Sequence, residues 1–139
     1  MPPPLHGSCF CGKVRFAVSG PLTEVCNCHC SLCRKQHAAA FRSRATVQAA
    51  DFAWLSGEDE LRHYEYRPGS FTCFCGTCGS RMISYSPNSP ETFGLPLALF
   101  DEDPGVRPKA HIMVAYKAPW HEIDGGLPQF DEFPPAAKT

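Results

Sequence analysis

The chain is organised around the stretch Cys26-Asn27-Cys28-His29-Cys30-Ser31-Leu32-Cys33-Arg34-Lys35, which places four thiols within eight residues. Thiolates this close together repel one another and are readily oxidised unless a cation neutralises them. A soft metal ion, most often zinc, therefore explains the spacing. Whether the site is closed or open depends on how many protein ligands the metal receives.

The nine cysteines of the chain suggest two metal sites. A structural zinc site takes four protein ligands, whereas a catalytic site keeps one position free for water or substrate. Cys9-Phe10-Cys11 and Cys75-Gly76-Thr77-Cys78 supply two pairs for one closed site, and Cys28-His29-Cys30-Ser31-Leu32-Cys33 is left to bind a second metal with three thiolates. The spacing leaves an alternative open, because Cys26 or Cys73 could equally serve as a fourth ligand.

Length and composition indicate one domain, 1–139, that buries about two thirds of its unfolded surface. No apolar run approaches the roughly 20 residues that span a bilayer, and the N-terminus lacks a signal pattern, so we expect a cytoplasmic protein without a membrane partner. Nine cysteines in that compartment favour reduced thiols and metal binding over disulfides. We expect residues 1–5 and 134–139 to be frayed.

The charge balance argues against nucleic-acid binding. Lys and Arg number 13 and Asp and Glu number 14, which leaves a formal net charge of −1. Non-specific binding to nucleic acid depends on clustered cations that neutralise phosphates. We therefore expect no nucleic-acid partner, and the sequence leaves the oligomeric state open.

The apolar pattern predicts a mostly β fold. Residues 13–18 alternate with Val14, Phe16 and Val18 on one side, which is typical of a half-buried strand. Further strands are expected over 45–52, 61–66, 80–85, 92–100 and 110–116. A short helical turn, capped by Ser31, is expected over 32–40, with a plain loop as the alternative. Fourteen prolines and eleven glycines leave little room for long helices, so we expect two small sheets joined by metal knuckles.

Taken in order, these motifs resemble the glutathione-dependent formaldehyde-activating enzyme (GFA) family, also called the centromere protein V domain family. The matching pieces are Gly7 through Phe16, Cys28 through Lys35, Ser56-Gly57 with Leu61 and Tyr64, Phe74 through Ser80, Pro108 through Ile112, and Trp120 through Phe130. The resemblance implies an Mss4-like β-tent fold and two Zn²⁺ per chain. It assigns a structural zinc to Cys9, Cys11, Cys75 and Cys78, assigns a catalytic zinc to Cys28, Cys30 and Cys33, and leaves Cys26 and Cys73 as spares.

The reaction that the resemblance implies is condensation of formaldehyde with glutathione to S-hydroxymethylglutathione, a carbon–sulfur lyase activity. Zinc deprotonates a coordinated thiol, so a substrate sulfur at the open position would arrive as a thiolate. Arg34, Lys35, Arg42 and Arg44 could receive the two carboxylates of glutathione, although exposed cations more commonly form a solvated face. His29 could act beside the metal or replace a thiol, but a residue between two ligands usually points away.

Two other functions fit parts of the pattern. One is a non-catalytic zinc-binding interaction module in which Cys26 or Cys73 closes the second site; the absence of a long basic extension counts against a nucleic-acid role for it. The other is an iron–sulfur protein, because thiolates also hold such clusters. A colourless purified protein would exclude the iron–sulfur protein.

Overall fold

The computed structural model describes residues 3–135, which fall into two compact units. The first unit comprises Met1–Glu24 and Ala45–Val106, and the second comprises Val25–Arg44 and Arg107–Thr139. The frayed ends expected at 1–2 and 136–139 lie outside the described residues. Leu5, which we expected in the frayed terminus, instead begins the first strand.

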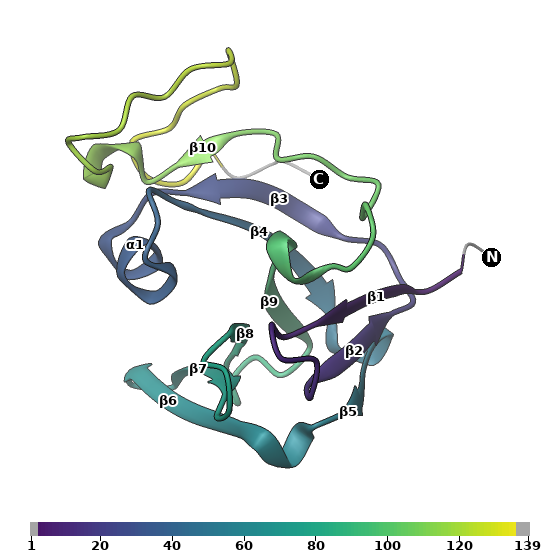
Figure 1. Cartoon of the computed structure of the whole chain (residues 1–139). Helices are drawn as coiled ribbons and strands as arrows, with labels where there is room; N and C mark the ends of the chain where they lie inside the picture. The colour runs from purple at the N-terminus through teal and green to yellow at the C-terminus, as the bar shows by residue number, and fades with distance from the viewer. Residues whose placement is uncertain (1–2, 136–139) are drawn as a thin grey trace. The chain divides into compact units, whose positions relative to one another are not determined.

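The first unit contains a three-stranded antiparallel sheet of order β1-β2-β5 (Figure 1). Its strands are β1 (Leu5–Ser8), β2 (Arg15–Val18) and β5 (Phe52–Ser56). Phe16 of β2 is fully buried, stacks on Phe52 with ring centroids 5.1 Å apart, and meets Trp54 edge to face. The alternation predicted around Val14, Phe16 and Val18 therefore places these three side chains in the core.

The remaining strands of the first unit form a meander in which β9, β8, β7 and β6 are hydrogen-bonded in that order, with β4 next to β9. Their bounds are β4 (Arg42–Gln48), β6 (Leu61–Arg67), β7 (Ser70–Cys75), β8 (Arg81–Tyr85) and β9 (Thr92–Pro96), with short 3₁₀ turns η1 (Ala49–Asp51), η2 (Glu58–Glu60) and η3 (Leu97–Leu99). Leu61 lies opposite Cys75 across the β6–β7 pair. Cys73 of β7, Met82 of β8 and Leu95 of β9 are fully buried.

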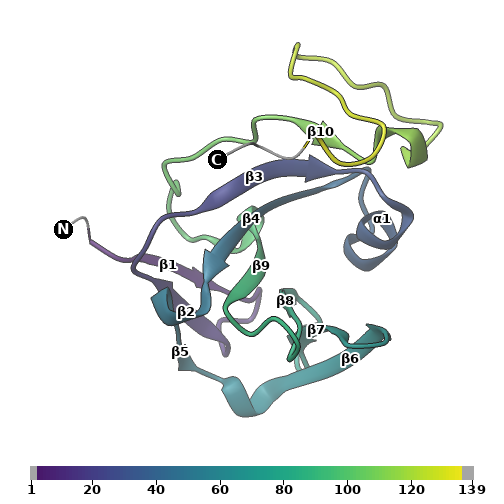
Figure 2. The same cartoon turned by 180° about the vertical axis from the view of Figure 1, so that it is seen from behind.

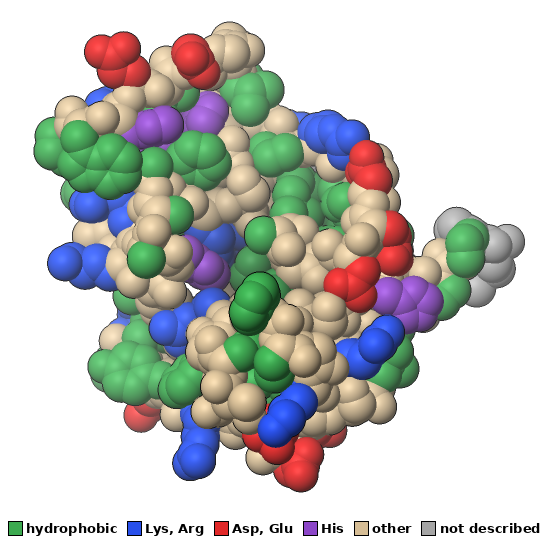
Figure 3. Space-filling view, in the orientation of Figure 1, with side chains coloured by type: hydrophobic (Ala, Val, Ile, Leu, Met, Phe, Trp, Pro, Cys, Tyr) green, Lys and Arg blue, Asp and Glu red, His purple; other side chains and the backbone are tan. Residues whose placement is uncertain are grey.

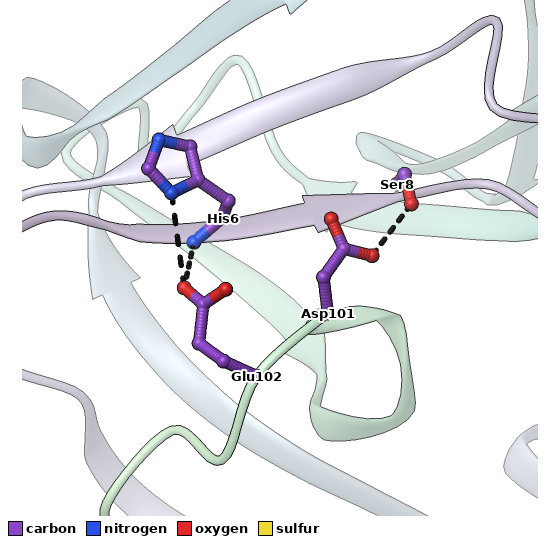
Figure 4. Close-up of polar contacts among 4 residues, drawn as sticks. All are labelled: His6, Ser8, Asp101 and Glu102. Atoms are coloured by element: carbon purple, nitrogen blue, oxygen red, sulfur yellow. Dashed lines mark hydrogen bonds and ion pairs between the residues drawn. The ribbon is translucent and has the colours of Figure 1, made fainter.

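Polar contacts tie β1 to the segment that follows η3 (Figure 4). The Ser8 hydroxyl donates to Asp101 Oδ1 at 2.6 Å, and the Asp101 backbone N–H donates to the His6 carbonyl at 2.9 Å. The His6 backbone N–H donates to Glu102 Oε1 at 2.5 Å. Since the side chains are exposed, each contact stabilises little by itself. Together they hold the end of β1 where the chain enters Cys9 and Cys11.

The second unit contains most of β3 (Thr23–Cys28), whose first two residues belong to the first unit, and the first residues of β4. It also contains the helix α1 (Ser31–His37), the strand β10 (His111–Ile112) and the turn η4 (Val114–Tyr116). β10 lies parallel to β3, with His111 opposite Asn27 and Ile112 opposite Cys28 (Figure 2). Residues 128–132 in turn donate to or accept from the backbone of residues 111–115. The strand that carries Cys28 is thus held from the C-terminal side.

The mostly β architecture with small sheets confirms the predicted fold class. The element boundaries differ from the predictions in two ways. Strands β1, β3, β5 and β7 were not among those expected, because they are short or interrupted by cysteines. The strands expected over 45–52, 92–100 and 110–116 each end early in a 3₁₀ turn. No helix within residues 3–135 has the length and apolar character needed to cross a membrane.

Candidate metal centres

Four cysteines of the first unit form a group whose Sγ atoms all lie within 4.8 Å of one another: Cys9, Cys11, Cys75 and Cys78. The Sγ atoms of Cys9 and Cys11 are 3.5 Å apart, and those of Cys11 and Cys75 are 3.8 Å apart. Sulfurs bound to one tetrahedral zinc at about 2.3 Å would be about 3.8 Å from each other. This group therefore fits a tetrahedral metal ion without rearrangement.

Backbone groups also prepare these sulfurs for a cation. The Val14 N–H donates to Cys9 Sγ at 3.3 Å, and the Cys78 N–H donates to Cys75 Sγ at 3.5 Å. Burial opposes ionisation of Cys78, but hydrogen bonds from the Ser80 hydroxyl and backbone outweigh it and lower the pKa of Cys78 to about 5. Hydrogen bonds to sulfur favour the thiolate, which is the form that binds metal.

Three cysteines of the second unit form the other group, again with all Sγ atoms within 4.8 Å of one another. Cys28 ends β3, Cys30 precedes α1, and Cys33 lies in the first turn of the helix. The N-cap of α1 is Cys30 and not Ser31 as expected, because Cys30 Sγ accepts the Cys33 N–H at 3.3 Å. The helix also ends earlier than expected, at His37, since Ala38 adopts the left-handed conformation.

The three thiols of this group influence one another's protonation through hydrogen bonds. Hydrogen bonds from the Cys28 and Cys33 thiols lower the pKa of Cys30 to about 2. The hydrogen bond with Cys30 raises the pKa of Cys28, and hydrogen bonds with Cys28 and Cys30 raise the pKa of Cys33. Binding of a divalent cation would displace the protons that Cys28 and Cys33 retain. Ile112, Met113 and Phe130 pack against the group and limit its contact with water.

Neither spare cysteine belongs to these groups. Cys26 lies on β3 two residues before Cys28 and packs against the cluster of Cys28, Cys33 and Ile112, but its Sγ is not among the sulfurs that lie within 4.8 Å of one another. Cys73 is fully buried in the first unit, where its thiol donates to the Ile83 carbonyl at 3.6 Å. The nine cysteines all lie within residues 3–135, and no disulfide joins any two of them.

His29 lies between two cysteines of the second group but points away from them. Its Nε2 is 2.8 Å from His111 Nδ1, and its ring centroid is 4.9 Å from that of Phe41. Burial and the neighbouring His111 lower the pKa of His29 to about 4, so the ring is neutral at physiological pH. His29 therefore packs against Phe41 and forms a hydrogen bond with His111. The pairing with His111 was not predicted from the sequence, because it depends on the parallel β3–β10 register.

The cations that follow the cysteines occupy different environments. Arg34 is half-buried and Lys35 exposed on α1, whereas Arg42 of β4 is only 7% exposed. The prediction of a solvated face therefore holds for Lys35 and is wrong for Arg42, which is buried. Residues 25–44 carry four Lys and Arg side chains and no Asp or Glu. Figure 3 shows cationic side chains beside histidine side chains over the part of the second unit that contains α1.

Comparison with known proteins adds three findings. The model of the family described as "GFA: Glutathione-dependent formaldehyde-activating enzyme" matches residues 4–116. A protein of Halomonas elongata named "Putative glutathione-dependent formaldehyde-activating enzyme" is 31% identical over 127 residues, which cover 86% of this chain and 81% of that protein. The crystal structure of a Rhodobacter sphaeroides protein has a TM-score of 0.60 at 24% identity and covers 91% of this chain and 99% of its own, which supports the fold alone.

Proposed function

The chain belongs to the glutathione-dependent formaldehyde-activating enzyme family, and from this premise we propose that it is a zinc enzyme acting on glutathione or a related thiol adduct. The proposed reaction is formation of S-hydroxymethylglutathione from formaldehyde and glutathione, of the carbon–sulfur lyase class. Two Zn²⁺ ions would bind per chain. Cys9, Cys11, Cys75 and Cys78 would hold the structural ion, and Cys28, Cys30 and Cys33 the catalytic one.

The observation that carries this proposal is the unequal size of the two cysteine groups. Four sulfurs complete a tetrahedron, whereas three leave one position for another ligand. Cys26 packs beside this group, but its Sγ is not among the three that lie within 4.8 Å of one another, which supports the count of three. A site with one open position suits a substrate that itself supplies a sulfur.

The proposed reaction balances without an oxidant or reductant. A bond forms between the glutathione sulfur and the carbonyl carbon of formaldehyde, and the C=O π bond breaks. The thiol loses one proton and the carbonyl oxygen gains one, so the atoms and charges balance. When bound, zinc lowers the pKa of a coordinated thiol and so supplies the thiolate nucleophile. Cys28, Cys30 and Cys33 would hold the ion, and Ile112 and Phe130, which pack at this cluster, would limit its contact with water.

Arg34 and Lys35 are the proposed substrate-binding residues. Both lie on α1 in the same helical segment as Cys33, and no acidic residue occurs between 25 and 44 to compete for them. Glutathione carries two carboxylates, which a guanidinium binds through paired hydrogen bonds. We also place the enzyme in the cytosol, where glutathione is reduced and free thiols persist.

The test compares Cys28→Ser with Cys26→Ser in the purified full chain. We expect wild type and Cys26→Ser to bind two zinc ions per chain and to consume formaldehyde in a glutathione-dependent manner. Cys28→Ser should keep its fold and one zinc ion but lose the glutathione-dependent activity. Equal activity in wild type and Cys28→Ser, both zinc-loaded, would contradict the proposed role of the three-cysteine group.

A further inference from the structure

Arg42 is a buried cation without an acidic partner. Its side chain is 7% exposed, and its Nε atom is buried with no hydrogen-bond partner. No carboxylate among residues 3–135 forms an ion pair with Arg42. An unpaired charge strongly destabilises a protein interior, so a buried arginine normally lies beside an anion.

The strand geometry identifies the group that faces Arg42. The Ser43 hydroxyl donates to Asn27 Oδ1 at 2.6 Å, so these two side chains lie on the same face of the neighbouring strands β4 and β3. Side chains alternate between faces along a strand. Arg42 and Cys28, each adjacent to one of these residues, therefore lie on the opposite face together.

The charges of this face agree with the geometry. Burial lowers the pKa of Arg42, while the nearby Cys33, Cys28 and Cys30 sulfurs favour its charged form. The effect is mutual, because Arg42 also favours the thiolate of Cys33. Arg44, the next cation on the same face, opposes the charge of Arg42 and so cannot serve as its counter-ion.

We propose that Arg42 is the buried counter-ion of the three-cysteine group, placed beside Cys28 by the pairing of β4 with β3. The inference rests on the proposed metal site. Three thiolates and one divalent cation carry a net charge of −1, which one guanidinium neutralises. Arg42 thus stabilises the net negative charge of the metal-bound three-cysteine group. It acts through the cysteines and is a positioning residue.

Metal affinity tests this role directly, with Arg42→Met removing the charge and Arg42→Lys keeping it. The probe is Co²⁺, whose thiolate charge-transfer absorbance reports binding, titrated in competition with a chelator. The Cys28→Ser chain identifies the signal of the four-cysteine group. Arg42→Met should weaken the three-cysteine site by about 10- to 100-fold, the usual effect of losing a residue that supports metal ligands. Arg42→Lys should recover most of this loss.

Lys109→Met is the matched control, since it removes one exposed cation from the same unit. Its Co²⁺ affinity should stay within about twofold of wild type because exposed charges are screened. Melting temperatures of Arg42→Met with and without metal separate a counter-ion from a structural residue. A counter-ion predicts a larger decrease with metal bound than without it, whereas a purely structural arginine predicts the same decrease in both forms with metal affinity unchanged.

The inference is overturned if Arg42→Met binds Co²⁺ as tightly as wild type, if Arg42→Lys is as weak as Arg42→Met, or if the three-cysteine group of wild type binds no Co²⁺. If Arg42→Met does not fold, Arg42→Lys decides, with affinity near wild type in support and a 10-fold or greater loss against. Absence of glutathione-dependent turnover in a metal-loaded wild-type chain would refute the proposed function and leave this affinity comparison unchanged.

Discussion

Replacing Cys75 with serine removes one ligand from the four-cysteine group, and we expect it to unfold or severely destabilise the first unit. Cys75 is fully buried at the end of β7, and its Sγ lies 3.8 Å from Cys11 Sγ. Because the sulfurs already have the spacing of a zinc tetrahedron, metal binding needs little rearrangement. Most of the binding free energy therefore stabilises the folded state.

The magnitude follows from the energy of structural zinc binding. Such sites contribute about 10–16 kcal/mol at neutral pH, so one of four ligands represents about 2.5–4 kcal/mol. Domains of this size are stable by only about 5–15 kcal/mol. The melting temperature of Cys75→Ser should fall by about 8 °C or more.

The assay is thermal unfolding followed by circular dichroism, with added zinc and with excess chelator. Cys73→Ser is the matched control, because Cys73 is equally buried on the same strand but belongs to neither cysteine group. We expect Cys73→Ser to melt near wild type in zinc and to lose stability in chelator. If Cys75→Ser has the same melting temperature as Cys73→Ser both in zinc and in chelator, the proposed structural metal is refuted.

Three further predictions concern single residues. Gly57→Ala should lower the free energy of unfolding by about 1–3 kcal/mol or more in urea titrations, since φ is +77° and a Cβ would lie 2.2 Å from the Lys13 carbonyl oxygen; an unchanged midpoint would contradict this. His111→Phe should destabilise by about 1–3 kcal/mol, because it removes the 2.8 Å contact to His29 Nε2 while His29 Nδ1 already lacks a partner; stability equal to wild type in the same titration would contradict this. Burial raises the pKa of Cys73 from its ordinary 9.0 to about 12, so the folded state disfavours the thiolate, and the associated stability is present below pH 9 and is lost as pH rises toward 12. Alkylation of Cys73, mapped by mass spectrometry, should therefore be slow at pH 8 in the native chain, and rapid labelling there would count against the buried thiol.

The cysteine spacing indicated the CxC and CxxC pairs and the CxCxxC set, whereas Cys26 and Cys73 stayed open as ligands until the family resemblance set them aside. CxC and CxxC pairs are local: two or three residues of separation bring sulfurs close in a knuckle or a helical turn, whatever surrounds them. Apolar alternation similarly predicted the core side chains Val14, Phe16 and Val18, because strand period two fixes the face on which each lies.

The tertiary structure decided the properties that depend on strand pairing. Arg42 belongs to a set of cations that the sequence predicted to be solvated. Only the pairing of β4 with β3 buries it beside Cys28. The parallel register of β10 likewise joins His111 to His29 across 82 residues. Helix and strand periodicity predict neither contact, because each joins strands that are separated in the sequence. The sequence thus indicated the two cysteine groups, and the sheet pairing decided which charges and rings surround them.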